Sequence, residues 1–339
     1  MRLLSLRPQL NPIIVREVRT RMRGVRPYAI LTVFLLLLSA VAYMFYQLMM
    51  QQARMGMTLM SAHVGQGLFN GLALCEIFLV VFLAPALTSG AISGEREQLT
   101  YDMLLATPLS PTRILWGKLI GALSYLLLLI VAAVPIFSVV LMFGGVEPRT
   151  MLKALALLLT TTLTFGMVGL TCSALLRRTS RATLVSYIAI LLLLASTTLP
   201  AVVWGQFSNP IGQMPPPWLV YLNPFSAVFS LTNVSFNTEI SSYYGYFDSF
   251  AGLPVATLLA PGVLYYGPNG QVLMPTYRAT MICFLALTLL LGWLSTHLVL
   301  PRRRWWPRLF DLGFALLFAA GLGLAYLARN WWYLAPPVV

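Results

Sequence analysis

The sequence predicts an all-α polytopic membrane protein with six core transmembrane helices, a seventh after them, an N-terminal interfacial helix and a short cytoplasmic helix. Three observations support this fold class. Of the 339 residues, 59% are hydrophobic and 9% are charged, whereas soluble domains carry roughly 25% charged residues. The apolar residues form long runs, and the mean hydropathy is +0.81. The basic residues are concentrated in segments that would face one side of a membrane.

Seven apolar runs are long enough to cross a membrane, which requires about 20 mostly apolar residues. They lie at 27–49, 68–92, 115–143, 151–176, 182–205, 279–300 and 309–328. The last run holds Asp311 near its start, but Trp306 and Trp331 flank it at a helical separation of about 37 Å. Because tryptophan is enriched at both membrane interfaces, we expect this run to span as well.

The basic residues predict the orientation of these helices. The chain carries 22 basic and 9 acidic residues, a net charge of +13. With a cytoplasmic N-terminus, 17 of the 22 basic residues fall on cytoplasmic segments, at 2–26, 96–118, 177–181 and 302–308. This asymmetry is the positive-inside signal, so the charge indicates topology in a plasma (inner) membrane and not a nucleic-acid partner. The first 26 residues carry seven arginines and lack an apolar core, so we expect no signal peptide.

The chain divides into three parts. Residues 1–26 form the cytoplasmic interfacial segment, and residues 27–300 form the six-span core. That core includes a cytoplasmic loop at 93–114 and a Pro-, Tyr- and Asn-rich external segment at 206–278. Residues 301–339 hold a basic cytoplasmic linker, the seventh span and a short external tail.

The N-terminal segment "NPIIVREVRTRMRGVRP" predicts an amphipathic helix on the inner leaflet. Its apolar residues recur every three or four positions, which places them on one face, and its arginines line the other. Such a helix binds the lipid interface. The residues assigned to it are Asn11 and Pro12, which cap and open the helix, and Arg16, Glu17, Arg19 and Arg23.

The loop "SGEREQLTYDMLLATPLSPTRILWGK", Ser93 to Lys118, holds Glu95, Glu97 and Asp102, a third of all the carboxylates. Acidic residues favour the first turn of a helix, and the residue before a proline disfavours helix. The loop therefore predicts one short amphipathic helix from about Glu95 to Thr107. Glu95 and Glu97 are two positions apart and do not face each other on a helix. No nucleophile or histidine accompanies them, so we expect no catalytic residue.

Cofactor motifs are missing from the sequence. No GxxxxGK[ST] loop occurs, so the chain has no such motif to hold ATP and Mg²⁺, and a partner ATPase would have to bind both. Cys75, Cys172 and Cys283 are about a hundred residues apart, which is not metal-ligand spacing. We expect no metal site and no cofactor on this chain.

Glu76 is the one acidic residue deep within an apolar run, about a third of the way into the second span from outside. A carboxylate at this depth is costly and marks a functional candidate by default. Two roles stay open for it. Glu76 could contact a substrate, or it could be a protonated acid that hydrogen-bonds to a neighbouring span.

The loop and two other stretches resemble the type-two ABC transporter permease family. In that family the loop between the second and third spans carries a "GERE-x-x-T…LLATPLS…GK" pattern, which this chain matches. "NPIIVREVRTRMRG" resembles the family's interfacial helix and "LNPFSA" an external motif, so the resemblance covers about residues 11–300. The seventh span and the long external segment depart from the usual pattern.

The resemblance implies a permease subunit of an ABC transporter, usually an exporter. Two permease copies or paralogues would pair and sit on two ATP-binding subunits. The short helix would be the coupling element that seats in the ATPase, with its charges meeting a socket there. The motif carries the coupling role to Gly94, Glu95, Arg96, Glu97, Gln98, Thr100, Leu104, Leu105, Thr107 and Pro108.

Three other functions stay open from the sequence alone. A stand-alone secondary transporter or channel is one, although such carriers usually need more intramembrane ionisable residues. A membrane enzyme is another, but no cluster of reactive side chains at one depth supports it. The third is envelope machinery that an ABC motor drives without export. No feature of the spans selects a substrate.

Overall fold

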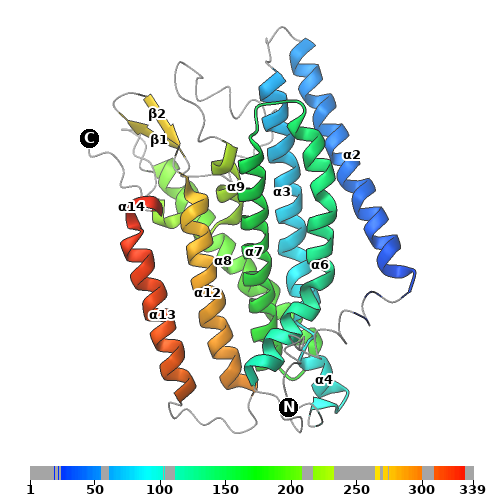
Figure 1. Ribbon diagram of the computed structural model, residues 1–339, viewed down its shortest axis with the longest axis vertical. Coiled ribbons are helices and arrows are strands. Elements are labelled where there is room, and N and C mark those ends of the chain that lie inside the picture. The colour runs from blue at the N-terminus through cyan, green and yellow to red at the C-terminus, as the bar shows by residue number, and fades with distance from the viewer. Residues whose placement is uncertain are drawn as a thin grey trace, which may run out of the picture.

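The computed structural model describes residues 19, 22, 24–54, 61–101, 103, 111–207, 217–232, 264–267, 270–273, 275–299 and 309–332. The long helices are α2 (Arg26–Arg54), α3 (Ser61–Thr88), α6 (Pro111–Leu141), α7 (Pro148–Leu175), α8 (Thr179–Phe207), α12 (Thr276–Val299) and α13 (Leu309–Leu327). The short elements are α4 (Ser93–Glu97), η1 (Pro217–Leu219), α9 (Pro224–Thr232), α14 (Arg329–Trp332) and the strands β1 (Leu264–Gly267) and β2 (Gly270–Leu273). Figure 1 shows the long helices side by side in one bundle.

The expected fold class is confirmed. Among the described residues, six helices are long and apolar enough to cross a membrane, namely α2, α3, α6, α7, α8 and α12. Their ends lie within seven residues of the apolar runs. Helices are the form that satisfies backbone hydrogen bonds within each segment, as a lipid environment requires.

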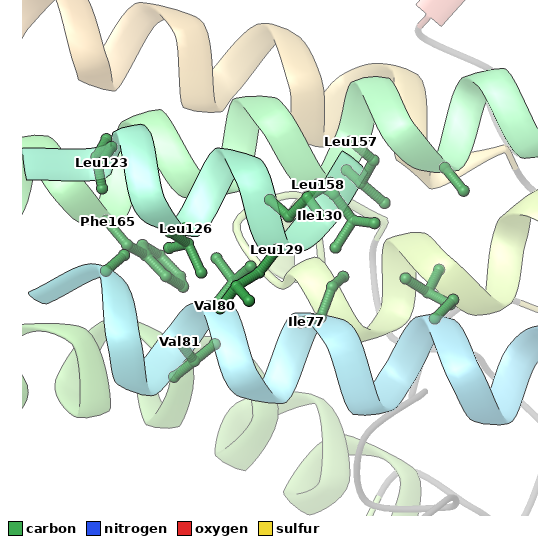
Figure 2. Packing of buried hydrophobic residues seen from close by; sticks show 14 of the residues in the cluster. Ile77, Val80, Val81, Leu123, Leu126, Leu129, Ile130, Leu157, Leu158 and Phe165 are labelled. Carbon is green, nitrogen blue, oxygen red and sulfur yellow. The ribbon is translucent and has the colours of Figure 1, made fainter. Parts of the chain in front are cut away.

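Helix α7 lies at the centre of the bundle and contacts α3, α6, α8, α9 and α12. Glycines allow this close approach, because a Cβ on Gly169 would lie 2.2 Å from Thr88 Oγ1 on α3. A Cβ on Gly166 would likewise lie 2.6 Å from Leu123 Cδ1 on α6. Around these contacts the α3–α6–α7 interface is apolar. Figure 2 shows its packing, with Ile77, Val80, Val81, Leu123, Leu126, Leu129, Ile130, Leu157, Leu158 and Phe165.

Hydroxyl groups join α7 to α12. Thr164 Oγ1 lies 2.9 Å from Thr288 Oγ1, and Thr171 Oγ1 lies 2.9 Å from Ser295 Oγ. Between membrane helices, where hydrophobic burial adds little, such interhelical hydrogen bonds and close packing supply the association energy. Both pairs join residues that are 124 positions apart in the sequence, so α7 and α12 run parallel in a fixed register.

The LNPFSA stretch starts a new helix, α9 (Pro224–Thr232). Asn223 Oδ1 accepts a hydrogen bond from the Phe225 N–H at 3.0 Å, and Pro224 opens α9. Helix α9 packs among α3, α7 and α12. The sequence did not predict the antiparallel β1–β2 pair, in which Gly267 lies opposite Gly270. The remainder of 206–278 lies outside the described residues.

Helix α13 runs antiparallel along α12 and is joined to it at both ends (Figure 1). At one end, Asp311 Oδ1 accepts a hydrogen bond from Trp293 Nε1 at 3.0 Å and lies 3.0 Å from His297 Nε2. At the other end, Arg278 Nη1 donates to the Trp331 carbonyl at 2.8 Å. The run expected at 309–328 is thus a helix that follows α12. Its apolar part, Gly313–Leu327, is shorter than the six spans.

Most of the expected interfacial helix lies outside the described residues, including Asn11, Pro12, Arg16, Glu17 and Arg23. Arg19 is helical and exposed. Gly24 has a φ of +104°, a conformation that suits glycine, and it lies two residues before the start of α2. Pro27 is the second residue of α2.

Candidate functional site

The site begins where α3 ends and the chain turns sharply into α4. Ser93 Oγ donates a hydrogen bond to the Ser89 carbonyl at 2.9 Å. The N–H groups of Ile92 and Ser93 both donate to Ser173 Oγ on α7, at 3.0 and 2.9 Å. These contacts satisfy backbone groups that a helix start leaves open. They fix α4 to the end of α7.

Glu95 binds α6. Its Oε1 forms an ion pair with Lys118 Nζ, and both side chains are largely buried. Glu95 Oε2 is buried and has no hydrogen-bond partner among the described residues. A buried charge is costly unless an opposite charge compensates it, so each of these two side chains depends on the other.

Arg96 and Tyr101 bind α7 and α12. Arg96 Nη1 donates to the Ala174 carbonyl at 2.9 Å, and its guanidinium lies 4.8 Å from the centroid of the Tyr101 ring. The Tyr101 hydroxyl in turn donates to the Val299 carbonyl at the end of α12. Both carbonyls belong to the last turn of a helix, where the backbone leaves acceptors open.

Glu97 binds α8. Its Oε1 accepts a hydrogen bond from the Thr179 N–H at 2.9 Å, and its Oε2 accepts one from Thr179 Oγ1 at 2.8 Å. Thr179 is the first residue of α8, so Glu97 caps that helix from another segment and places a negative charge at its positive end. Ser89 and Thr183 add a second link to α8, at 2.8 Å between their hydroxyl oxygens.

The segment 93–101, which we call the α4 staple, therefore connects the ends of four spans, α6, α7, α8 and α12. The sequence suggested that Glu95, Arg96 and Glu97 would meet a socket on a partner. In the structure these three side chains bind this chain's own helices.

The single helix expected from Glu95 to Thr107 is wrong in its extent. Helix α4 ends at Glu97, and Leu99 has a φ of +58°, a left-handed conformation that is strained for a residue with a Cβ. The Leu99 side chain is 85% exposed, and that of Met103 is 75% exposed. An unusual backbone conformation at an exposed apolar residue is itself a pointer to function.

The other residues carried over from the motif divide into two groups. Gln98 and Thr100 are exposed beside Leu99, and Gly94 lies within α4. Leu104, Leu105, Thr107 and Pro108 lie outside the described residues.

Four residues of the site were not recognised from the sequence: Tyr101 of the staple, and Lys118, Ser173 and Thr179, which the staple binds. Lys118 gave the only usable signal, because it follows the start of an apolar helix by seven residues. A lysine inside an apolar helix needs a partner. The other three are common in helices and lie far along the chain from the residues they bind.

Glu76 lies at the sixteenth of the 28 residues of α3 and about a third of the way into the candidate membrane span Gly65–Glu97. Its side chain is 1% exposed. Neither carboxylate oxygen has a hydrogen-bond partner among the described residues. No described residue of a neighbouring span donates the hydrogen bond that the sequence left open for Glu76.

Comparison with known proteins identifies the family. A family model described as ABC-2 family transporter protein matches residues 12–300, most of the chain, and it ends before α13. No curated protein matches the chain. Proteins of this family are membrane domains without a nucleotide-binding motif, and they generally work as pairs with an ABC ATP-binding partner. The chain therefore belongs to the ABC-2 transporter family, as a multi-pass membrane subunit of an ABC transporter.

Proposed function

We propose that the chain is the permease of an ATP-driven exporter in the plasma (inner) membrane, with a cytoplasmic N-terminus. In this proposal a separate ATP-binding subunit holds ATP and Mg²⁺ and docks at the α4 end of the bundle. A second permease copy or paralogue completes the complex. The observation that carries the proposal is the α4 staple, which connects four spans at one end of the bundle.

The staple supports a coupling role because its links fix the position of α4 relative to four spans. An ion pair, a two-point carboxylate cap and hydrogen bonds to two helix ends hold α4 in one position. A partner that displaces α4 must either break these bonds or move the attached spans with it. Close-packed helices transmit such a displacement along their length because packed interiors are not compressible.

The proposed docking surface is apolar and consists of Leu99 of the staple and Met103, which follows it. Leu99 and Met103 expose apolar side chains at the tip of the segment, while the neighbouring charges bind within the chain. Apolar anchors of this kind carry most of the binding energy in protein interfaces. We propose that this tip contacts the ATP-binding subunit and that the staple transmits its movement.

Export is favoured over ion-coupled transport by the scarcity of intramembrane charge. Among the described spans, Glu76 is the one ionisable acid near the middle of a helix. Proton- or ion-coupled carriers place several such groups along a pathway. The family resemblance supports the outward direction.

The experiment that tests docking compares Leu99→Asp with Met142→Asp. Both side chains are highly exposed, at 85% and 86%, and Met142 lies at the α6–α7 turn at the opposite end of the bundle. Aspartate also tolerates the left-handed conformation better than leucine, so the first variant retains the local fold. Each variant is co-purified with the ATP-binding protein encoded beside the chain.

We expect Leu99→Asp to lower the recovered ATP-binding subunit about tenfold or more, because an interfacial apolar anchor is replaced by a desolvated charge. Met142→Asp should recover as much as the unaltered chain. Equal recovery by both variants would show that the tip is not the docking surface.

A further inference from the structure

Glu76 combines deep burial with the lack of a hydrogen-bond partner among the residues that the structure describes. Its side chain is 1% exposed, at the middle of α3. Among the described residues, none donates a hydrogen bond to either oxygen. Buried polar groups in native proteins are nearly always paired, so each exception needs an explanation.

No described charge lies at the depth of Glu76 on the helices that contact α3. Glu76 is 12 residues from the nearer end of α3, about 18 Å along the helix. The charged residues whose side chains are described on those helices lie near helix ends: Arg113 and Lys118 on α6, Arg149 and Lys153 on α7, and Arg181 on α8. An isolated buried carboxylate is strongly disfavoured unless something neutralises it.

The surroundings of Glu76 on α3 are apolar and aromatic. Phe69 lies two turns before Glu76 and Val80 one turn after it, on the same side of the helix, and both are fully buried. Phe69 contacts Phe137 of α6 edge to face, with 5.6 Å between ring centroids. A buried carboxylate among apolar side chains, with a pair of aromatic rings about two helical turns away, is suited to a ligand that is apolar and positively charged, since a carboxylate and an aromatic face both attract a cation.

We propose that Glu76 is the anionic contact of an intramembrane binding site for lipophilic cations, and that such cations are a substrate class of the transporter. The proposal rests on the exporter function proposed above and names its cargo. A bound cation supplies the positive charge that no described residue places beside the Glu76 carboxylate.

The test measures binding to the full chain in lipid nanodiscs, without an ATP-binding subunit. The probe is tetraphenylphosphonium, and tetraphenylborate, an anion of the same shape, controls for apolar partitioning. The variants are Glu76→Gln and, as the matched control, Glu147→Gln. Glu147 makes no capping hydrogen bond with its side chain at the start of α7.

We expect the unaltered chain and Glu147→Gln to bind tetraphenylphosphonium above the level of empty nanodiscs. Glu76→Gln should bind it at least about tenfold more weakly, which corresponds to about 1.4 kcal/mol, with no change for tetraphenylborate. Equal binding by Glu76→Gln, or no binding above empty nanodiscs, would overturn the proposal. Because no ATPase is present, either result is independent of the docking test with Leu99→Asp.

Thermal unfolding provides a second measurement that keeps the proposal falsifiable. If Glu76 serves a ligand and not the fold, Glu76→Gln and Glu76→Leu should melt at the same temperature as the unaltered chain or higher. A functional residue commonly lowers stability in this way. A fall in melting temperature for both variants would assign Glu76 a structural role and overturn the binding site.

Discussion

Lys118 of α6 forms an ion pair with Glu95 of α4, the short helix that lies between α3 and α6 in the chain. The two residues are 23 positions apart. Lys118 also makes a further interaction of its own. The pair ties a five-residue helix to a 31-residue one, so the position of α4 is set by a membrane helix and not by its own short backbone.

The ion pair predicts an asymmetry between single and double substitutions. Lys118→Met leaves the Glu95 carboxylate buried without a partner, and removing one member of a buried pair costs about 3 kcal/mol or more. The double variant Glu95→Leu/Lys118→Met removes both charges and should recover most of that stability. Thermal melting of the chain in detergent or nanodiscs measures both.

Equal melting temperatures for the single variant and the unaltered chain would show that the pair contributes nothing. Arg149→Met, which removes an exposed charge from the start of α7, is the control and should melt within a degree or so of the unaltered chain, since surface changes are usually within about 0.5 kcal/mol.

Close packing of α7 on α3 predicts a specific cost at Gly169. In Gly169→Ala the new Cβ would lie 2.2 Å from Thr88 Oγ1 and 3.1 Å from Pro85 Cα. Thr88 cannot easily yield, because its hydroxyl donates to the Ala84 carbonyl at 2.8 Å. We expect a loss of about 1–3 kcal/mol from overpacking, measured as a lower melting temperature.

The control for this substitution is Gly321→Ala on α13, where a new Cβ would meet no atom within 4 Å. Alanine is a better helix former than glycine, so this variant should be neutral or slightly more stable. If Gly169→Ala were as stable as Gly321→Ala, the α3–α7 contact would be looser than described.

The bond between Asp311 and Trp293 predicts how α13 is held. Asp311→Asn keeps an oxygen acceptor for Trp293 Nε1, whereas Asp311→Leu removes it. We expect Asp311→Leu to raise amide hydrogen exchange in α13, because the helix loses its polar contact at that end. Exchange in α7 should not change. Identical exchange in α13 for both variants would show that Asp311 does not hold this helix.

The sequence predicted the spans well because each depends on local composition. About 20 apolar residues in a row are enough to identify a membrane helix, and α6 and α7 begin within four residues of the expected positions. The helix start at Asn223–Pro224 was also predictable, since one side chain and one ring determine it locally. The Gly-Glu-Arg-Glu run correctly indicated the family.

The contacts of that run were not predictable, because they depend on how distant segments meet. Glu97 and Thr179 are 82 positions apart, and Tyr101 and Val299 are 198 apart. The break at Leu99 was missed because no glycine or asparagine marks it. The β1–β2 hairpin was also missed, although Pro268-Asn269 separates its strands.

Coupling through the α4 staple is tested most directly by a distance measurement in the assembled complex. Spin labels are placed at Met142 in the α6–α7 turn and at Leu199 on α8, both exposed, after replacement of the three native cysteines. The distance between the labels is measured without nucleotide and with trapped ATP, in the otherwise unaltered chain and in Glu95→Leu/Lys118→Met. We predict that ATP shifts the distance in the otherwise unaltered chain. The double variant should still bind the ATP-binding subunit but show no shift. An equal shift in both would contradict transmission through the Glu95–Lys118 pair.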